Sequence, residues 1–306
     1  MANLRIAYLI TFYKDIEHLG RLITNIQGAA VDIYIHNDKK NNINLKLIEG
    51  QYEHGKIFVL DDPLIITWGG FNLTRCFIML MNTCLKNGVY DYIFLISGQD
   101  FPLANHHQIN SFLLKNKGKE FVEYYDIPYA GWPNLNGGID RYQYLWPVDD
   151  MGLYKAQDFV NYQKKENIKR PFPEMLKPYG GSCWFTITYR FMEYICNYLD
   201  DHQEYLYEYF NYVLLADEIL LQSIMLNSPF KNNIVNNNLR YIDWHSGPEY
   251  PKLLTIADNK EMHKSDCLFA RKFDSATDNE IINLLERKLQ GSSRSIKTEI
   301  EQAINQ

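Results

Sequence analysis

LRIAYLIT, at residues 4–11, is the stretch that decides the fold. It is mostly apolar and rich in large side chains, which is typical of a buried strand. The same alternation continues along the first hundred residues, with strands predicted at 31–35, 58–60 and 90–97 and helical apolar spacing at 15–26 and 73–87. Strands that alternate with helices indicate an α/β fold, in which helices cover a sheet.

The second half of the chain is less regular. Between residues 120 and 147 Pro and Gly recur every few residues and no period survives, which is typical of binding loops. Further on, a strand is predicted at 183–188 and helices at 189–199 and 217–227. The sequence TDNE at 277–280 has the form of a capping box before a last helix, and Gly291 interrupts that pattern ahead of a polar tail.

Composition excludes several classes of protein. The 306 residues are 46% hydrophobic and 22% charged, so the chain can bury one large core or two modest ones, and it is neither disordered nor a small disulfide scaffold. With 31 basic and 37 acidic residues, the net charge of −6 provides no overall positive field for nucleic acid or an anionic membrane. Any bound anion must therefore be met by a few placed cations.

The distribution of apolar residues and cysteines bears on the compartment. No apolar run approaches the ~20 residues that a membrane helix needs, and no signal-peptide pattern is visible at the N-terminus. The five cysteines are scattered without a CxxC pair, which fits a reducing compartment and argues against disulfides and structural zinc. We expect a soluble cytoplasmic protein whose cysteines are small buried apolar residues.

Polar residues follow two of the predicted strands. His36 and Asp38 come after the second strand, and Asp100 follows the fourth. Because α/β sheets bind ligands beyond the carboxyl ends of their strands, these side chains are candidates for contacts to a ribose or a base. Asx residues also end strands for purely local reasons, so each residue alone leaves both interpretations open.

Several motifs that hold phosphates or metals are missing from the sequence. There is no GxGxxG after the first strand, no P-loop, no HExxH, no EF-hand loop and no DxD. Adjacent Asp pairs occur at 61–62, 149–150 and 200–201, but the side chains of neighbouring residues diverge in an extended chain. Nothing in the sequence therefore calls for a metal ion.

Two other groups could carry chemistry. Asp217 and Glu218 stand where a helix is predicted to begin, so they either cap that helix or project a carboxylate into a cleft. Lys252 and the pair Arg271 and Lys272 lie in apolar sequence, where they either extend to the surface or meet an anion such as a diphosphate. Aromatic residues in the loops could stack on sugars or bases: Trp132, Tyr142, Tyr144, Trp146, Trp184 and Trp244.

Taken together, these features suggest a nucleotide-dependent transferase with carbohydrate contacts, and a family resemblance supports that interpretation. Eight blocks in this order resemble the family-14 glycosyltransferases, which include the core-2 and I-branching β-1,6-N-acetylglucosaminyltransferases and the peptide O-xylosyltransferases. The blocks are IYIHNDKK, WGGFNLTRCFIMLM, FLISGQDFPL, GGSCWFTITYRF, ADEILLQSIMLNSPF, LRYIDW, PKLLT and LFARKFD. The resemblance extends over residues 5–274.

The resemblance implies a GT-A fold, a Rossmann-like mixed sheet flanked by helices. It predicts one catalytic domain at 1–275, with a nucleotide-binding half at 1–115 and an acceptor and catalytic half at 116–275, followed by a helical tail at 276–306. It also implies an inverting transfer from a UDP-sugar without a metal ion. N-acetylglucosamine is the leading donor sugar and xylose the alternative.

The resemblance also implies roles for individual residues. It makes Glu218 the catalytic base and aligns Lys252 and Lys272 with the basic pair that binds the diphosphate; the branching enzymes have Arg at the first of these, so Lys252 keeps the charge but loses the bidentate geometry. Nucleotide-sugar contacts are expected from Asp38, His36, Asp100 and Arg271. Acceptor contacts are expected from Glu123, Arg141, Asp217 and Trp244, with Asp217 also capping its helix and orienting the base.

The sequence departs from the animal members of the family, which have a membrane anchor, a stem and paired cysteines. We therefore expect a bacterial, cytoplasmic enzyme that builds a surface polysaccharide or glycoconjugate, with peripheral association at the inner membrane face left open. The expected partners are a UDP-sugar donor and a glycan acceptor, with no cofactor. Two alternatives remain at this stage: a metal-dependent glycosyltransferase with another donor, and a carbohydrate-binding module without catalytic activity.

Overall fold

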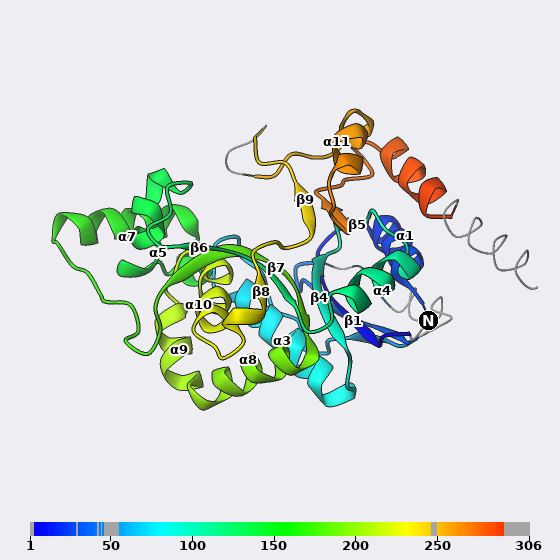
Figure 1. Cartoon of the computed structure of the whole chain (residues 1–306). Helices are drawn as coiled ribbons and strands as arrows, with labels where there is room; N and C mark the ends of the chain where they lie inside the picture. Colours follow the sequence, from blue (N-terminus) through cyan, green and yellow to red (C-terminus); the bar gives the residue numbers. More distant parts are fainter. Residues whose placement is uncertain are drawn as a thin grey trace, which may run out of the picture.

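The computed structural model describes residues 3–28, 30–41, 43, 45, 55–245 and 250–290. A seven-stranded mixed sheet in the order β3-β2-β1-β4-β7-β6-β8 forms its centre (Figure 1). The first four strands are parallel, β7 runs antiparallel to β4, and β6 runs antiparallel to β7. The strands are β1 (Ile6–Phe12), β2 (Val31–Asn37), β3 (Ile57–Val59), β4 (Tyr92–Ser97), β6 (Glu120–Asp126), β7 (Tyr179–Thr188) and β8 (Ile234–Val235).

Helices cover both faces of this sheet. One face packs against α3 (Asn72–Asn87), α8 (Tyr189–Asp201) and α10 (Leu220–Leu226), and the other against α1 (Ile16–Ile26), α4 (His106–Lys115) and the helical residues 280–290. The side chains of β1 alternate between the two cores, because successive residues of a strand point to opposite faces. The predicted α/β class, with a mixed sheet flanked by helices, is confirmed.

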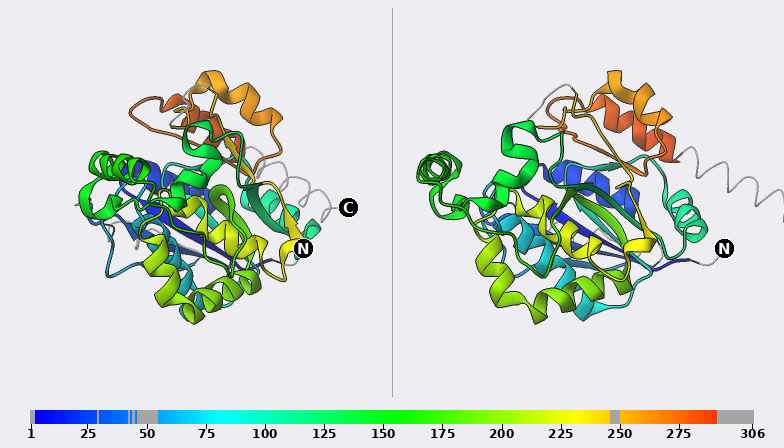
Figure 2. Two further views of the ribbon diagram at one scale, coloured as in Figure 1. Left: turned by 90° about the vertical axis from the view of Figure 1, so that its left-hand side faces the viewer. Right: turned by 60° about the vertical axis from the view of Figure 1, so that its left-hand side comes forward.

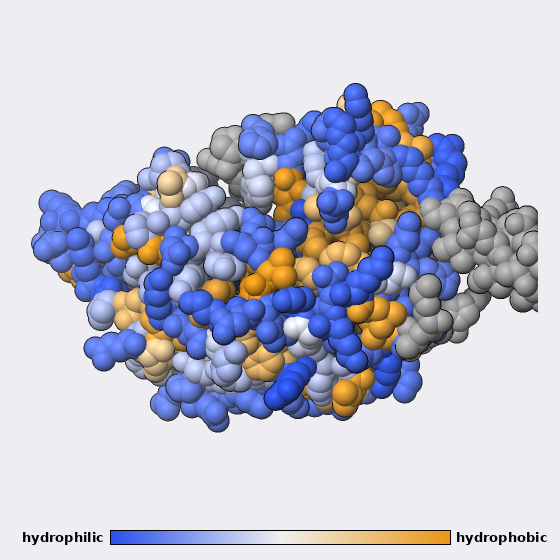
Figure 3. Space-filling view, in the orientation of Figure 1, coloured by the Kyte–Doolittle hydropathy of each residue, from blue (hydrophilic) through white to orange (hydrophobic). Residues whose placement is uncertain are grey.

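Smaller elements surround the sheet. A three-stranded sheet in the order β5-β10-β9 includes β10 from the region of residues 250–290, and the helical residues 280–290 lie next to α1, where Arg21 donates to Asn283 and Glu286 (Figure 2). In the view of Figure 3 most of the surface is hydrophilic, with an apolar area below α11. The remaining elements are β5 (Phe101–Pro102), η1 (Pro133–Gly138), α5 (Ile139–Gln143), α6 (Val148–Met151), α7 (Leu153–Lys165), α9 (Gln203–Phe210), η2 (Ala216–Glu218), η3 (Lys231–Asn233), β9 (Arg240–Ile242), η4 (Ile256–Asp258), α11 (Asn259–Lys264) and β10 (Phe269–Arg271).

A buried arginine joins the two sheets. Arg240 begins β9, is 5% exposed, and donates to Thr186 Oγ1 at 2.7 Å and to the carbonyl oxygens of Leu95 and Phe185, both at 3.0 Å. Its guanidinium also lies over the rings of Phe94 and Phe269. These hydrogen bonds from a buried guanidinium connect β9 to β4 and β7, and so position the small sheet against the main one.

The structure corrects three local predictions. The stretch predicted to be irregular from residue 120 onward begins with a regular strand, β6, and short helices follow it. The helix predicted to begin at Asp217 begins at Leu220, after the 3₁₀ turn η2, and no side chain caps it. At the last helix Asp278, rather than Thr277, accepts the backbone N–H groups of Glu280 and Ile281. The predicted tail beyond residue 290 lies outside the described residues.

The cysteines largely match their prediction. Four of the five are buried and free, whereas Cys267 is half-buried. Burial raises the pKa of each thiol, so all five are poor nucleophiles at neutral pH. Within the part of the chain that the structure describes, we find no helix with the length and apolar character needed to cross a membrane.

Glu120, at the start of β6, is a buried carboxyl whose ionisation should affect stability. It is 1% exposed and accepts from the backbone N–H and the hydroxyl of Thr188, and burial raises its pKa from 4.5 to about 7. Between these two values the unfolded chain loses the proton while the folded chain keeps it. Stability should therefore fall as the pH rises through this window, by about 1.4 kcal/mol per pKa unit.

Glu120→Gln tests this expectation, because glutamine imitates the protonated carboxyl. Its amide oxygen can accept from the Thr188 N–H and its NH₂ can donate to the Thr188 hydroxyl, which is able to accept. We expect urea unfolding between pH 4.5 and pH 8 to show a shallower loss of stability in the variant than in the unmodified chain. Equal slopes for the two proteins would show that Glu120 ionises normally.

Candidate active site

The site is built at one edge of the main sheet. The parallel strands β1, β2 and β4 all end at this edge. Because β7 is antiparallel to β4, with Phe94 paired to Thr186, the first half of β7 continues past the end of that pairing to the same edge. The end of β6 arrives there too, with Tyr124 paired to Gly181. The segments that leave these strands therefore meet in one region.

Glu218 is held at this edge by an arginine. Its Oε2 lies 2.5 Å from Nη1 of Arg141, and the Glu218 side chain is 24% exposed while that of Arg141 is 6% exposed. The guanidinium of Arg141 lies 3.6 Å from the centre of the Trp132 ring. The backbone carbonyl of Arg141 accepts from Leu214 N–H. The carboxylate is thus fixed in orientation through one oxygen, while part of the side chain stays open to solvent.

A glycine allows this arrangement. A Cβ atom at Gly180, in β7, would lie 2.5 Å from the Trp132 ring, which is closer than any side chain tolerates. The ring therefore packs directly on the backbone of β7, with Arg141 on its face. The Gly180-Gly181 pair of the sequence thus has a structural role in placing the partner of Glu218.

Asp217 differs from its predicted roles. It is 4% exposed, its Oδ1 has no hydrogen-bond partner among the described residues, and it caps no helix. Burial, and then the charge of Glu218, raise its pKa, whereas Arg141 and a contact with the Cys183 thiol act in the opposite direction. A carboxyl that is buried in this way favours its neutral form. Asp217 is therefore a buried carboxyl next to Glu218, and the prediction that it caps the helix is wrong.

Glu123 lies close to the same group. Its Oε2 accepts from Asn238 Nδ2 at 2.6 Å, and its Oε1 accepts from the Tyr125 hydroxyl. Burial raises the pKa of Tyr125, and the charges of Glu123 and Glu218 raise it further, which indicates that both carboxylates are near this phenol. The structure thus brings together three predicted residues: Glu123, Arg141 and Glu218.

Two cations face the site from the end of β10. Arg271 is 8% exposed, its Nε lies 3.5 Å from Asp100 Oδ1, and its guanidinium lies 4.1 Å from the centre of the Trp184 ring. Its Nη1 is buried and, within the described part of the chain, makes no hydrogen bond. Lys272 is half-buried, and burial together with the charges of Arg271 and Lys14 lowers its pKa. In the described ranges no carboxylate oxygen lies within 4.0 Å of its ammonium nitrogen.

Lys252 lies in a neighbouring segment but already has a partner. The backbone N–H of Leu254 donates to the carbonyl of Lys272 at 2.8 Å, which joins the two segments. The ammonium of Lys252, however, lies 2.5 Å from Asp258 Oδ1. Of the two predicted diphosphate lysines, Lys272 is the one whose charge is not already neutralised by a close carboxylate.

The carboxylates and the cations share one environment around β7. The charges of Asp217, Glu218 and Asp100 raise the pKa of the Cys183 thiol, while the charge of Arg271 lowers it. Two contacts place these groups beside the same strand: Asp217 meets the Cys183 thiol, and the guanidinium of Arg271 lies over the ring of Trp184, the next residue of β7. The predicted base, which follows Asp217 in sequence, and Arg271 therefore both lie beside β7, and Lys272 follows Arg271 in the chain.

The remaining predicted residues lie at the end of β2 and beyond β9. His36 is 1% exposed and its Nε2 accepts from Leu64 N–H at 2.8 Å, while burial lowers its pKa. Asp38 accepts from Lys40 N–H at 3.0 Å and from Ile66 N–H at 3.5 Å. Both residues hold the segment that follows β3. Trp244 is 50% exposed and follows the residue whose carbonyl accepts from Lys252 N–H.

The structure also identifies residues that sequence reasoning did not single out. Tyr125 is two positions after Glu123 in a strand, and this period of two could have placed both on one face. Lys14 lies two residues after the end of β1, and its Nζ is 2.5 Å from Asp274 Oδ2. Of the six aromatic candidates, Trp132 and Trp184 stack on the two site arginines, whereas Tyr144 and Trp146 belong to a hydrophobic core.

Residues 6–265 match the family model described as Core-2/I-Branching enzyme. The chain is 25% identical to xylosyltransferase 2 of Canis lupus familiaris, covering 94% of this chain and 34% of that protein, and 25% identical to xylosyltransferase 1 of the same organism, covering 95% and 31%. The chain thus spans about a third of the length of these relatives. The crystal structure of S. aureus TarS 1-349 in complex with UDP-GlcNAc matches 39% of this chain and 34% of that one, with 10% identity and a TM-score of 0.25.

Proposed function

Because the chain belongs to the Core-2/I-Branching enzyme family, we propose that it is a glycosyltransferase of the GT-A fold that uses a UDP-sugar as donor and a hydroxyl of a glycan or glycoconjugate as acceptor. N-acetylglucosamine is the proposed donor sugar, with xylose as the alternative. One observation carries the proposal: a partly exposed carboxylate, Glu218, lies beside the same strand as Arg271, a buried cation whose Nη1 makes no hydrogen bond within the described structure, and Lys272 follows Arg271 in the chain.

Glu218 is the proposed catalytic base. Inverting transfer needs the acceptor hydroxyl to lose its proton as it attacks the anomeric carbon from the face opposite the leaving group. Arg141 engages Oε2 of Glu218, so Oε1 is the oxygen proposed to receive that proton. Glu123 and Trp244 are the proposed acceptor contacts, since Glu123 is a half-buried carboxylate and Trp244 an aromatic side chain that is 50% exposed.

Arg271 and Lys272 are the proposed stabilisers of the leaving group. UDP departs with additional negative charge on its β-phosphate, and fixed cations aimed at that charge lower the barrier. Although Arg271 pairs with Asp100 through Nε, its buried Nη1 makes no hydrogen bond within the described chain, and the ammonium of Lys272 has no carboxylate oxygen within 4.0 Å there. We propose that they replace a divalent ion, and that Asp38, His36 and Asp100 shape the nucleotide end of the site.

The compartment is part of the same proposal. Four buried cysteines and the half-buried Cys267 are all free, which supports a reducing environment. We propose a cytoplasmic role in the synthesis of a bacterial surface polysaccharide or glycoconjugate.

A donor screen tests the proposed function. We expect UDP-sugars to raise the melting temperature of the protein in EDTA, while GDP-sugars leave it unchanged, because ligands that bind the folded state stabilise it. Transfer from the stabilising donor should proceed in EDTA as it does with Mn²⁺. Loss of transfer in EDTA that Mn²⁺ restores would contradict metal independence, and a response to GDP-sugars alone would contradict the donor class.

A further inference from the structure

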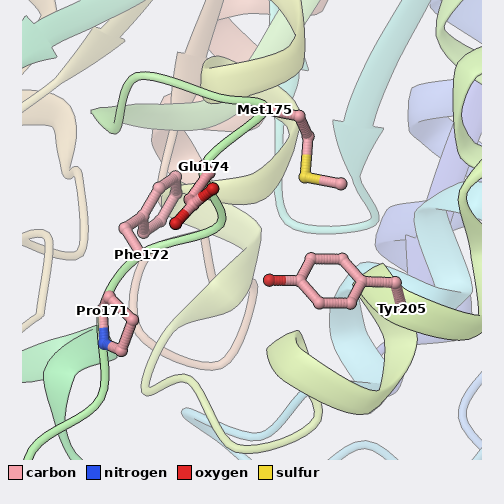
Figure 4. A pocket seen from close by; sticks show the side chains of 5 residues that line it. All are labelled: Pro171, Phe172, Glu174, Met175 and Tyr205. Carbon is pink, nitrogen blue, oxygen red and sulfur yellow. The ribbon is translucent and has the colours of Figure 1, made fainter.

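Two hollows lie on opposite sides of α9, outside the site described above. The first has a volume of about 560 Å³ and is lined by Pro171, Phe172, Glu174, Met175 and Tyr205 (Figure 4). The second has a volume of about 280 Å³ and is lined by Phe71, Arg75, Tyr207, Glu208, Asn211 and Tyr212. Tyr205 and Tyr207 are two positions apart on a helix, which places them about 200° apart around its axis and directs them into different hollows.

The lining of both hollows combines aromatic rings with polar groups. In the first, Tyr205 and Met175 remain 48% and 45% exposed, and Glu174 adds a carboxylate to the lining (Figure 4). In the second, Tyr207 and Tyr212 accompany Glu208 and Asn211. A sugar ring has an apolar face of C–H groups and an edge of hydroxyls. Exposed aromatic rings suit the face, and carboxylate or amide oxygens accept hydrogen bonds from the edge.

A network of hydrogen bonds connects the hollows to the catalytic carboxylate. Arg170 donates to the carbonyl oxygens of Tyr142, Tyr209 and Tyr212, at 3.0, 2.9 and 2.7 Å. It therefore fixes the loop that carries Phe172 to α9 and to the residue that follows Arg141. The ring of Phe172 packs edge-on against Tyr142, with 4.9 Å between ring centres. The first hollow is thus anchored to the element that supplies the partner of Glu218.

The second hollow is linked to the same carboxylate along the chain. Tyr212 lines it and lies six residues before Glu218. Leu214 N–H donates to the carbonyl of Arg141, and Leu215 N–H donates to the carbonyl of Gly69, two residues before Phe71 in the hollow wall. Both hollows and the proposed base therefore belong to one hydrogen-bonded framework.

The charges select among possible glycans. Glu174 and Glu208 bring a negative charge to each hollow, and Arg75 of the second hollow also donates to Asn72 Oδ1 at 3.2 Å. Acidic glycans would meet repulsion in the first hollow, which has no cation in its lining. Uncharged sugars satisfy the carboxylates without that penalty.

From these observations we propose that the first hollow beside α9 provides secondary subsites for the outer sugars of a neutral oligosaccharide acceptor. This inference rests on the proposed function and extends it to the substrate class. The subsites would raise the affinity for long acceptors over short ones, while the chemistry at Glu218 stays the same.

A chain-length comparison tests the subsites. The probes are lactose and neutral oligosaccharides of four and six sugars that share its terminal structure, and the quantity measured is kcat/KM for transfer from the UDP-sugar. We expect the longer probes to be better acceptors, and Tyr205→Ala and Glu174→Gln to lower the ratio of long to short acceptor by about tenfold or more. Tyr154→Ala, an aromatic residue of α7 that is 90% exposed, is the matched control and should leave the ratio unchanged.

Binding measurements separate this inference from the proposed function. The intact chain is applied to an array of neutral glycans, acidic glycans and peptides, and the same variants are compared. If the chain binds neutral glycans and Tyr205→Ala weakens that binding, the result supports the subsites. If, in addition, no UDP-sugar supports transfer, the result contradicts the proposed function but not the subsites. The subsites are overturned if transfer occurs but kcat/KM does not depend on acceptor length and the ratio of long to short acceptor is the same in the variants. Binding of acidic glycans or peptides alone, or of no array component, also overturns them.

Discussion

Glu218→Gln should lower the rate of glycosyl transfer by about 10²–10⁴-fold, the range that a positioned general base contributes. Glutamine has nearly the same shape, and its amide oxygen can still accept from Arg141, which now lies 2.5 Å from the carboxylate. What the variant loses is the ability to take a proton. The measurement is product formation from the UDP-sugar and an accepted glycan, by mass spectrometry at saturating donor.

Two further readouts make this test specific. The affinity for UDP, measured by calorimetry, should change little, because the cations proposed to bind it come from β10 and not from η2. Glu193→Gln, an exposed carboxylate of α8, is the control for a lost charge elsewhere and should retain full activity. Transfer at more than a tenth of the unmodified rate in Glu218→Gln would exclude Glu218 as the base. If the unmodified chain shows no transfer at all, that result would favour the alternative that it is a carbohydrate-binding module.

The strands that sequence reasoning predicted best are those buried on both faces. β1 and β4 are almost entirely apolar, so their assignment needs no knowledge of what packs against them. β6 was missed because Glu120 and Glu123 interrupt its apolar residues. Each carboxylate is satisfied by a partner that lies far away in sequence, Thr188 for the first and Asn238 for the second. Such partners become visible only once the fold is known.

The site residues were also predictable only in part. Family resemblance pointed to Glu123, Arg141 and Glu218, and the structure places these three together. The family resemblance could not reveal that Asp217 is buried, because its burial depends on the 3₁₀ turn that precedes α10. Nor could it separate the two predicted lysines. Lys252 is neutralised by Asp258, which a turn of η4 brings back toward it.

Because Lys252 is paired with a carboxylate and Lys272, within the described residues, is not, substitution of the two lysines should affect kcat very differently. Lys272→Met should lower kcat by about 10²–10³-fold, as the loss of one fixed donor does at other sites of developing negative charge. Lys252→Met should cost considerably less, because Asp258 already balances its charge. The two variants remove the same group from neighbouring segments, so each is the control for the other. Equal losses, or a larger loss in Lys252→Met, would contradict the assignment of Lys272.

The pH profile offers an independent check on Lys272, because its environment disfavours its charge. Burial, together with Arg271 and Lys14, lowers its pKa, so the ammonium loses its proton earlier than an exposed lysine as the pH rises. Activity should therefore decline on the alkaline side as this cation is lost. Lys272→Arg should recover part of the activity lost in Lys272→Met and move the alkaline decline to higher pH, because a guanidinium stays charged throughout that range. An unmoved decline in Lys272→Arg would assign the titration to another group and leave Lys272 without a role in stabilising the departing UDP.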